Sequence, residues 1–137
     1  MKICRALLQH GAERKGRNKH GLNVLHIAAQ GDQPVSLYYF HKIEKMSITE
    51  QDDRGSTPLH WACFSCSELA LIFILAWVGT EDTSELAIQD QDGYTPLHLA
   101  VKSCEELQSS RPVRALLFKD APFNIPDKQG RLPIDLA

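Results

Sequence analysis

Three histidines recur along the chain at intervals that suggest a shared chemical role. His26, His60 and His98 are 34 and 38 residues apart, and imidazole nitrogen is a common ligand of transition metals. Intervals of this length belong to a repeated unit, which places the rings roughly 10 Å apart, whereas the ligands of one zinc ion lie about 2 Å from it. We therefore expect each histidine to hydrogen-bond neighbouring backbone, and we assign no metal site.

Cysteine offers a second chemistry at Cys63-Phe-Ser-Cys66, which matches a Cys-x-x-Cys redox or zinc half-site. Zinc would need two further ligands, and no second pair stands at a fitting spacing; a thioredoxin-like role would need a strand before a helix. We interpret the pair as two small residues near a helix end. The other two cysteines are Cys4 and Cys104. So few cysteines at irregular spacing are typical of a reducing compartment, which predicts a cytoplasmic protein.

The sequence lacks the motifs of the common enzyme classes. It contains no Gly-rich phosphate loop, no Gly-x-Ser-x-Gly elbow and no plausible Ser/His/Asp order, so we predict a chain without catalytic activity or cofactor. Its charges are scattered and sum to −2, which argues against a nucleic-acid partner. The longest apolar run, Leu69–Val78, is about half the length of a membrane span.

One unit recurs four times. Four segments align on a glycine, with steps of 34, 38 and 37 residues between glycines: 18–28, 52–62, 90–100 and 127–137. An Asp or Asn three residues before each glycine favours a tight turn, in which glycine supplies a positive φ. Thr57-Pro58 and Thr95-Pro96 then begin helices, because threonine caps free N–H groups and proline fits the first helical position. Second helices are expected around Leu69–Leu75 and Val113–Leu117.

This pattern resembles the ankyrin repeat over nearly the whole chain, and the two Thr-Pro-Leu-His copies at Thr57 and Thr95 are highly specific for it. The resemblance implies an all-α fold, an ankyrin-repeat solenoid of helix-turn-helix units with β-turn or hairpin fingers. We expect a single array over residues 1–137. It divides into a partial repeat, three repeats and a second partial repeat: 1–17, 18–51, 52–89, 90–126 and 127–137.

Some stretches depart from the ankyrin pattern. The first copy has Asn23-Val24 in place of Thr-Pro, and Leu132–Asp135 in the last copy resembles the ending repeat of many ankyrin arrays. Because the steps exceed the usual period of about 33 residues, we expect longer loops at 79–84 and 102–111. Ile3–Ala12 resembles the second helix of a preceding repeat, and both ends look cut from a longer array.

The implied architecture provides a binding surface. Stacked units present their turns and first helices as an extended concave face that suits recognition of a partner protein or peptide. Trp61 stands where other units have Ile27, Leu99 and Leu136, and it either anchors a partner there or packs between helices. A Trp61→Ala change is expected to weaken partner binding by roughly 1–3 kcal/mol with little loss of folding. The finger tips, with mixed charge, are either further partner-binding residues or solvated tips without a role: Lys19, His20, Asp53, Arg54, Gln91, Asp92, Lys128 and Gln129.

The expected helix Leu69–Val78 is apolar on every side. Such a helix is normally buried, and this one belongs to a unit with neighbours on both sides. The second helix of an ankyrin repeat usually has a polar back, however. Ile72, Phe73 or Trp77 could therefore be covered by another domain, a membrane surface or a second copy, and the sequence leaves both interpretations open.

One stretch resembles a narrower group. Residues 55–63, Gly-Ser-Thr-Pro-Leu-His-Trp-Ala-Cys, are similar to a unit in the N-terminal ankyrin arrays of DHHC-type protein S-acyltransferases, membrane-bound palmitoyltransferases that use the array to recruit clients. A Trp in this setting helps those arrays to recognise client peptides, so the resemblance implies that role for Trp61. This chain contains no Asp-His-His-Cys motif, cysteine-rich zinc domain or transmembrane helix. The alternative is a free-standing cytosolic ankyrin adaptor or inhibitor.

Overall fold

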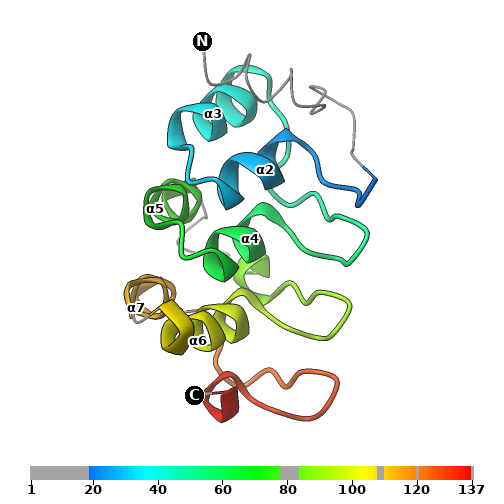
Figure 1. The fold of residues 1–137 in the computed structure, drawn as a ribbon, viewed down its shortest axis with the longest axis vertical. Helices are drawn as coiled ribbons and strands as arrows, with labels where there is room; N and C mark the ends of the chain where they lie inside the picture. Colours follow the sequence, from blue (N-terminus) through cyan, green and yellow to red (C-terminus); the bar gives the residue numbers. More distant parts are fainter. Residues whose placement is uncertain (1–18, 78–83, 108–109, 120, 137) are drawn as a thin grey trace.

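The computed structural model is a stack of helix pairs with a row of finger-like turns along one side (Figure 1). It describes residues 19–77, 84–107, 110–119 and 121–136. All regular secondary structure in these residues is helical, mainly in the α-helices α2 to α7. The all-α repeat fold expected from the sequence is therefore confirmed.

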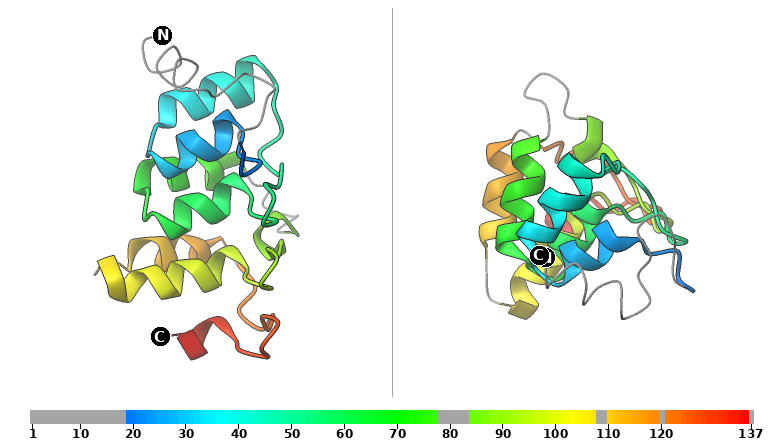
Figure 2. Two further views of the ribbon diagram at one scale, coloured as in Figure 1. Left: turned by 45° about the vertical axis from the view of Figure 1, so that its right-hand side comes forward. Right: turned by 90° about the horizontal axis from the view of Figure 1, so that it is seen from above.

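The inner layer consists of the first helix of each pair, stacked one on the next. These helices are α2 (Val24–Gln30), α4 (Pro58–Phe64) and α6 (Pro96–Leu107), and the short 3-10 helix η3 (Pro133–Leu136) continues the stack. The fingers precede these helices and all project to the same side in both views of Figure 2.

The outer layer consists of the second helices. α3 (Pro34–Tyr38) runs into the π-helix η1 (Tyr39–Ile43), and α5 (Glu68–Trp77) packs between α3 and α7 (Arg111–Phe118). One more 3-10 helix, η2 (Ser84–Ala87), leads toward the finger around Gly93. The helices expected around Leu69–Leu75 and Val113–Leu117 are thus confirmed.

The inner helices begin where the capping residues predict. The Thr57 side chain accepts a hydrogen bond from the His60 N–H at the start of α4, and Pro58 occupies the first turn, where it loses no hydrogen bond. In α2, Asn23 takes the place of threonine, and its side-chain oxygen accepts from the N–H groups of Leu25 and His26. Asparagine and threonine both satisfy the free donors of a helix start, so the departure at Asn23 does not interrupt the repeat.

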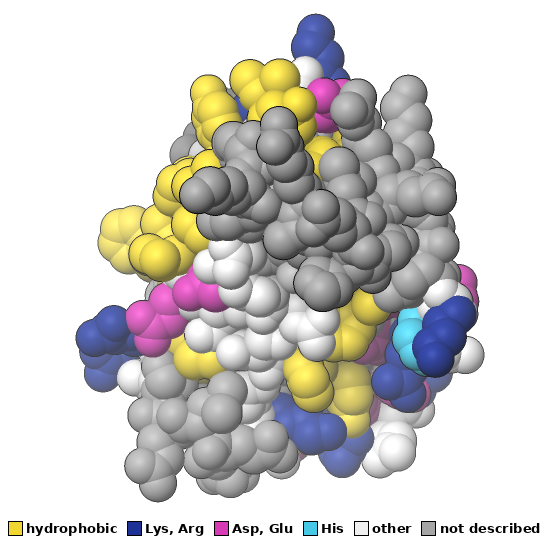
Figure 3. Space-filling model, turned by 45° about the horizontal axis from the view of Figure 1, so that its top comes forward, with side chains coloured by type: hydrophobic (Ala, Val, Ile, Leu, Met, Phe, Trp, Pro, Cys, Tyr) yellow, Lys and Arg dark blue, Asp and Glu magenta, His cyan; other side chains and the backbone are white. Residues whose placement is uncertain are grey.

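The core lies between the two helix layers, and α5 is buried on one side only. Its Leu71 and Ile74 are almost completely buried, whereas Leu69 and Ile72 are more than half exposed, at 53% and 57%. The expectation of a buried helix therefore holds for the side that faces the inner layer. Figure 3 shows hydrophobic side chains gathered on the outer side of α3 and α5.

The loop expected at 102–111 is wrong in its first part. Helix α6 continues to Leu107, and α7 begins at Arg111, so most of the extra residues lengthen a helix. The added turn brings the Ser103 hydroxyl 2.9 Å from the carbonyl oxygen of Phe64, at the C-terminal end of α4. Carbonyls at a helix end lack an intrahelical donor, and Ser103 supplies one. The loop expected at 79–84 lies outside the described residues except for Ser84, which begins η2, and the partial repeat with Ile3–Ala12 also lies outside them.

Candidate functional site

Three of the fingers are tight turns closed by the same two backbone hydrogen bonds. In the finger around Gly55, the Asp52 N–H donates to the Ser56 carbonyl and the Gly55 N–H donates to the Asp52 carbonyl, both at 2.9 Å. The fingers around Gly93 and Gly130 repeat this pair. The four turn glycines all have φ between 79° and 81°, so the glycines occupy one regularly repeated environment, as the sequence predicted: Gly21, Gly55, Gly93 and Gly130.

Backbone hydrogen bonds join the finger tips into a row. Asp53 N–H donates to His20 at 3.2 Å, Gln91 N–H to Arg54 at 2.7 Å, and Lys128 N–H to Asp92 at 3.1 Å, each to the carbonyl oxygen of the preceding finger. The side chains of the eight tip residues selected from the sequence are all exposed along this row. The tips therefore form one continuous, exposed row along the stack.

The repeating histidines tie each inner helix to the next finger. The Nε2 atoms of His26, His60 and His98 lie 2.9, 2.9 and 3.0 Å from the carbonyl oxygens of the following finger, at Ser56, Tyr94 and Arg131. The prediction that these histidines hydrogen-bond neighbouring backbone is therefore confirmed. Burial lowers the pKa of His60 below its usual value, because an imidazolium would lose its hydration in this position.

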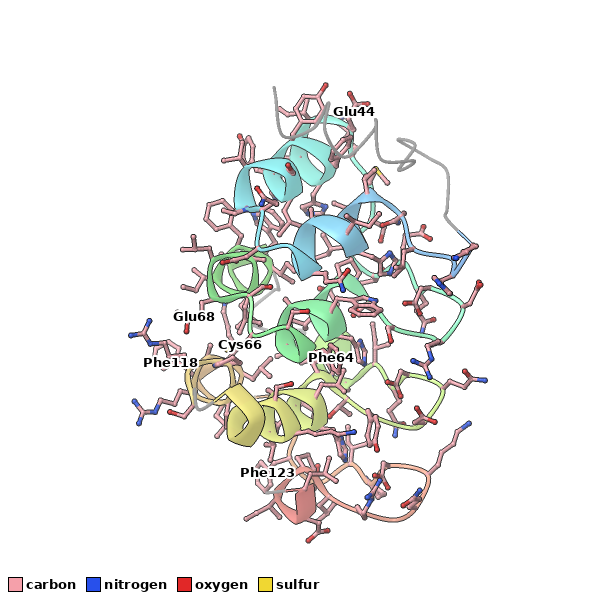
Figure 4. All side chains as sticks on the ribbon, in the orientation of Figure 1. Glu44, Phe64, Cys66, Glu68, Phe118 and Phe123 are labelled. Atoms are coloured by element: carbon pink, nitrogen blue, oxygen red, sulfur yellow. The ribbon has the colours of Figure 1, made fainter. Side chains whose placement is uncertain are left out.

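A half-open hollow lies between the fingers around Gly55 and Gly93 and the helices α4 and α6. Its volume is about 220 Å³, and its lining combines apolar rings with charged groups at the rim: Arg54, Ser56, His60, Trp61, Phe64, Asp90, Asp92, Tyr94, Leu99 and Lys102. Phe64, which lies between α4 and α6 in Figure 4, is half exposed. We refer to this feature below as the hollow.

Trp61 forms the inner wall of the hollow and is held there by a polar contact. Its indole Nε1 donates to Asp52 Oδ2 at 2.9 Å, and its ring meets the Phe64 ring edge-to-face with centroids 5.8 Å apart. The same ring is half-buried and packs against the core. A Trp61→Ala change would therefore remove core contacts, which revises the expectation of little loss of folding.

Comparison with protein families agrees with this geometry. A family model described as ankyrin repeats in three copies matches residues 1–82, and a model of the single ankyrin repeat matches residues 92–128. The chain belongs to the ankyrin-repeat family. Ankyrin repeats are generally non-catalytic and bind other proteins, so the chain is a protein–protein interaction module.

The ankyrin array brings only part of the sequence-selected residues into the hollow. Trp61, Arg54 and Asp92 line it, whereas six tip residues do not: Lys19, His20, Asp53, Gln91, Lys128 and Gln129. Sequence reasoning did not select the other lining residues of the hollow: Ser56, His60, Phe64, Asp90, Tyr94, Leu99 and Lys102. Spacing offered one signal, because Phe64 follows Trp61 by three residues, which places the two rings on the same side of a helix.

Cys63 and Cys66 lie at and just after the C-terminal end of α4. Cys63 is fully buried, and burial raises the pKa of its thiol, so the nucleophilic thiolate is disfavoured. Cys66 is half-buried, and both are free thiols. In the part of the chain that the structure describes, no group of three His, Cys, Asp or Glu side chains is placed to hold a metal ion.

The described segments also bear on whether the chain crosses a membrane. None of their helices is both long and apolar enough to span a bilayer.

Proposed function

We propose that the hollow binds one side chain of an extended peptide segment in a partner protein, with the finger row orienting the rest of the segment. The hollow, at about 220 Å³, is smaller than the pockets of roughly 300–1,000 Å³ that enclose small-molecule ligands. It is also half-open to solvent, which leaves room for a continuing chain. A single apolar side chain presented by a peptide fits both properties.

The aromatic walls would supply most of the binding energy. Buried aromatic residues commonly dominate protein interfaces, and Trp61, Phe64 and Tyr94 all line the hollow. Trp61 is already held by Asp52, so its ordering costs little when a partner binds. The exposed tips would add polar contacts that set the direction of the peptide, and in this proposal Arg54 and Asp92 lie nearest to it.

Phe64 provides the sharpest test, because its side chain is 50% exposed and its removal should not disturb the core. Peptides selected from a random display library on the wild-type chain would be titrated against Phe64→Ala. We expect binding at least about tenfold weaker, which corresponds to roughly 1.4 kcal/mol.

Phe118→Ala is the matched control, since Phe118 on α7 is 89% exposed and lies outside the hollow. It should bind the selected peptides with unchanged affinity. Peptides that bind Phe64→Ala as tightly as the wild-type chain would show that this hollow is not the binding site.

We also propose that the array is the client-recruiting region of a membrane-bound protein S-acyltransferase. The proposal is supported by the Thr57-Pro-Leu-His-Trp61 stretch and by the position of Trp61 on the wall of the hollow. Sequencing the transcript beyond Ala137 tests it directly. An Asp-His-His-Cys motif in a cysteine-rich segment with apolar spans is expected, whereas further repeats followed by a stop codon would indicate the free-standing adaptor.

A further inference from the structure

Three fingers stabilise their turns with an equivalent aspartate. Each of these aspartates accepts two backbone N–H groups of its own finger through Oδ1 at 2.9 Å, and the three are Asp52, Asp90 and Asp127. The two hydrogen bonds commit one carboxylate oxygen and hold the side chain in one orientation. The second oxygen, Oδ2, then points in a direction set by the turn.

In two of the fingers a side chain of this protein uses that second oxygen. Trp61 Nε1 donates to Oδ2 of Asp52 at 2.9 Å, and Arg131 Nε donates to Oδ2 of Asp127 at 3.0 Å. These carboxylates are therefore satisfied within the array, in line with the cost of leaving a desolvated carboxylate oxygen without a donor.

Asp90 is the exception. The positions that align with Trp61 and Arg131 hold Leu99 and Tyr94. The Leu99 side chain has no donor, and the Tyr94 hydroxyl accepts from Arg131, so neither side chain donates to Oδ2 of Asp90. Among the residues that the structure describes, Oδ2 of Asp90 has no hydrogen-bond or ion-pair partner. Asp90 is half-buried and lines the hollow, so its unused acceptor belongs to a residue of the proposed peptide site.

The cationic side chains at the rim of the hollow do not donate to Oδ2 of Asp90. The Lys102 ammonium lies over the Tyr94 ring, 5.6 Å from its centroid, and neither Lys102 nor Arg54 forms an ion pair within the described residues. Arg54 and Lys102 balance Asp90 and Asp92 in formal charge. Selectivity in the hollow would therefore come from the short-range geometry of the Asp90 acceptor and little from long-range attraction.

We propose that Asp90 determines the specificity of the hollow by accepting a hydrogen bond from a lysine or arginine side chain of the partner, next to the apolar side chain that packs on Trp61. This inference rests on the proposed peptide binding in the hollow. A cationic donor fits better than a neutral amide, because it adds Coulombic attraction to the negatively charged carboxylate beyond the hydrogen bond itself.

Asp90→Asn tests the inference with little change to the fold. Asparagine keeps a side-chain oxygen for the two backbone N–H groups and replaces Oδ2 with an NH₂ group. Peptides from a random display library that bind the wild-type chain, but not Phe64→Ala, should be enriched in lysine or arginine. Their affinity should fall at least about tenfold on Asp90→Asn.

Two controls separate the hydrogen bond from general charge effects. Asp53→Asn changes the same charge at an exposed tip outside the hollow and should leave affinity unchanged. A peptide whose basic residue is replaced by glutamine should bind the wild-type chain about tenfold more weakly and Asp90→Asn without further loss.

The outcomes distinguish the inference from the proposed function. Peptides that need Phe64 but bind wild type and Asp90→Asn equally would overturn the role of Asp90 and leave the hollow as the binding site. A loss on Asp90→Asn that does not depend on a basic peptide residue would also overturn it, since the donor would then be peptide backbone. Recovery of no Phe64-dependent peptide would overturn both proposals.

Discussion

At the scale of single residues, the threonine and histidine of each Thr-Pro-Leu-His copy form one hydrogen-bonded unit. His60 Nδ1 accepts the Thr57 N–H at 3.2 Å and lies 2.8 Å from the Thr57 hydroxyl, while its Nε2 lies 2.9 Å from the Tyr94 carbonyl. A ring that accepts at Nδ1 must carry its proton at Nε2 in order to donate to a carbonyl. The neutral ring therefore fits both contacts. A second proton, on Nδ1, would disrupt the contact with the Thr57 N–H.

The first prediction concerns the pH dependence of stability. Burial lowers the folded-state pKa of His60 below the unfolded value of about 6.5. Between these two pKa values, His60 is protonated in the unfolded chain and neutral in the folded chain. The free energy of unfolding should fall as pH drops below about 6.5, by up to about 1.4 kcal/mol per pH unit until the lowered folded pKa is reached. Above that window His60 contributes no pH dependence. Urea unfolding over this range measures it.

His60→Gln is the reference for this measurement, because glutamine does not titrate. It should be less stable at neutral pH, since the bond to Tyr94 is lost or weakened, but its stability should depend less on pH between about 6.5 and 5.5. Parallel profiles for the two chains would rule out His60 as the titrating group.

At the scale of elements, the turn between the two helices of a pair requires an unusual backbone conformation. Cys66 joins α4 to α5 with φ 53°, and Asp32 joins α2 to α3 with φ 54°. These values lie in the left-handed region, which costs most residues about 1 kcal/mol and which asparagine tolerates better. Asp32 compensates with a contact to the next pair, since its side chain accepts from the Ala70 N–H at 2.8 Å. No such compensation is found for Cys66 among the described residues.

The second prediction follows from this strain. Cys66→Asn should raise the free energy of unfolding by about 0.5–1 kcal/mol, because asparagine adopts the left-handed conformation at lower cost. Chemical denaturation followed by circular dichroism measures the change. Cys66→Ser is the matched control, since it removes the sulfur without improving tolerance of the conformation. An equal gain in both variants would assign the effect to the thiol instead.

At the scale of the whole molecule, the array is held together by contacts that recur from one unit to the next. Backbone hydrogen bonds join the finger tips, the histidines reach the following finger, and Ser67 and Ser103 donate to helix-end carbonyls of the preceding unit at 3.0 and 2.9 Å. Repeat arrays derive much of their stability from such neighbour interfaces. A change at one finger should therefore matter most where another finger packs against it.

The third prediction compares two fingers with the same backbone conformation. A Cβ added at Gly93 would lie 2.6 Å from the Lys128 backbone nitrogen, whereas one added at Gly130 meets nothing within 4 Å among the described residues. Both positions have positive φ, at 81° and 79°, so both Ala variants share a cost of about 1–2 kcal/mol. Gly93→Ala should lose at least about 1 kcal/mol more, because the tip contact between Lys128 and Asp92 must shift.

Denaturant unfolding of the two alanine variants measures this difference directly. Equal losses of unfolding free energy would mean that close packing between fingers contributes nothing measurable to the stability of the array.

The repeat, its turns and the starts of its helices could all be predicted from the sequence. Glycine at a positive φ, and threonine and proline at a helix start, act on groups within a few residues of themselves. Their effects therefore depend little on the rest of the fold, and their recurrence identified the solenoid. The histidine contacts could be expected for a related reason, because each copy occupies the same place relative to the next unit.

The hollow and the length of α6 were decided by tertiary structure. Trp61 and Phe64 belong to one unit, and Asp90, Tyr94 and Leu99 belong to the next, so only stacking places them around one volume. The stretch from Lys102 to Leu107 carries no local signal that separates loop from helix, and the contact of Ser103 with Phe64 lies 39 residues back in the chain. Side chains this far apart in sequence meet at positions set by the packing of whole helices.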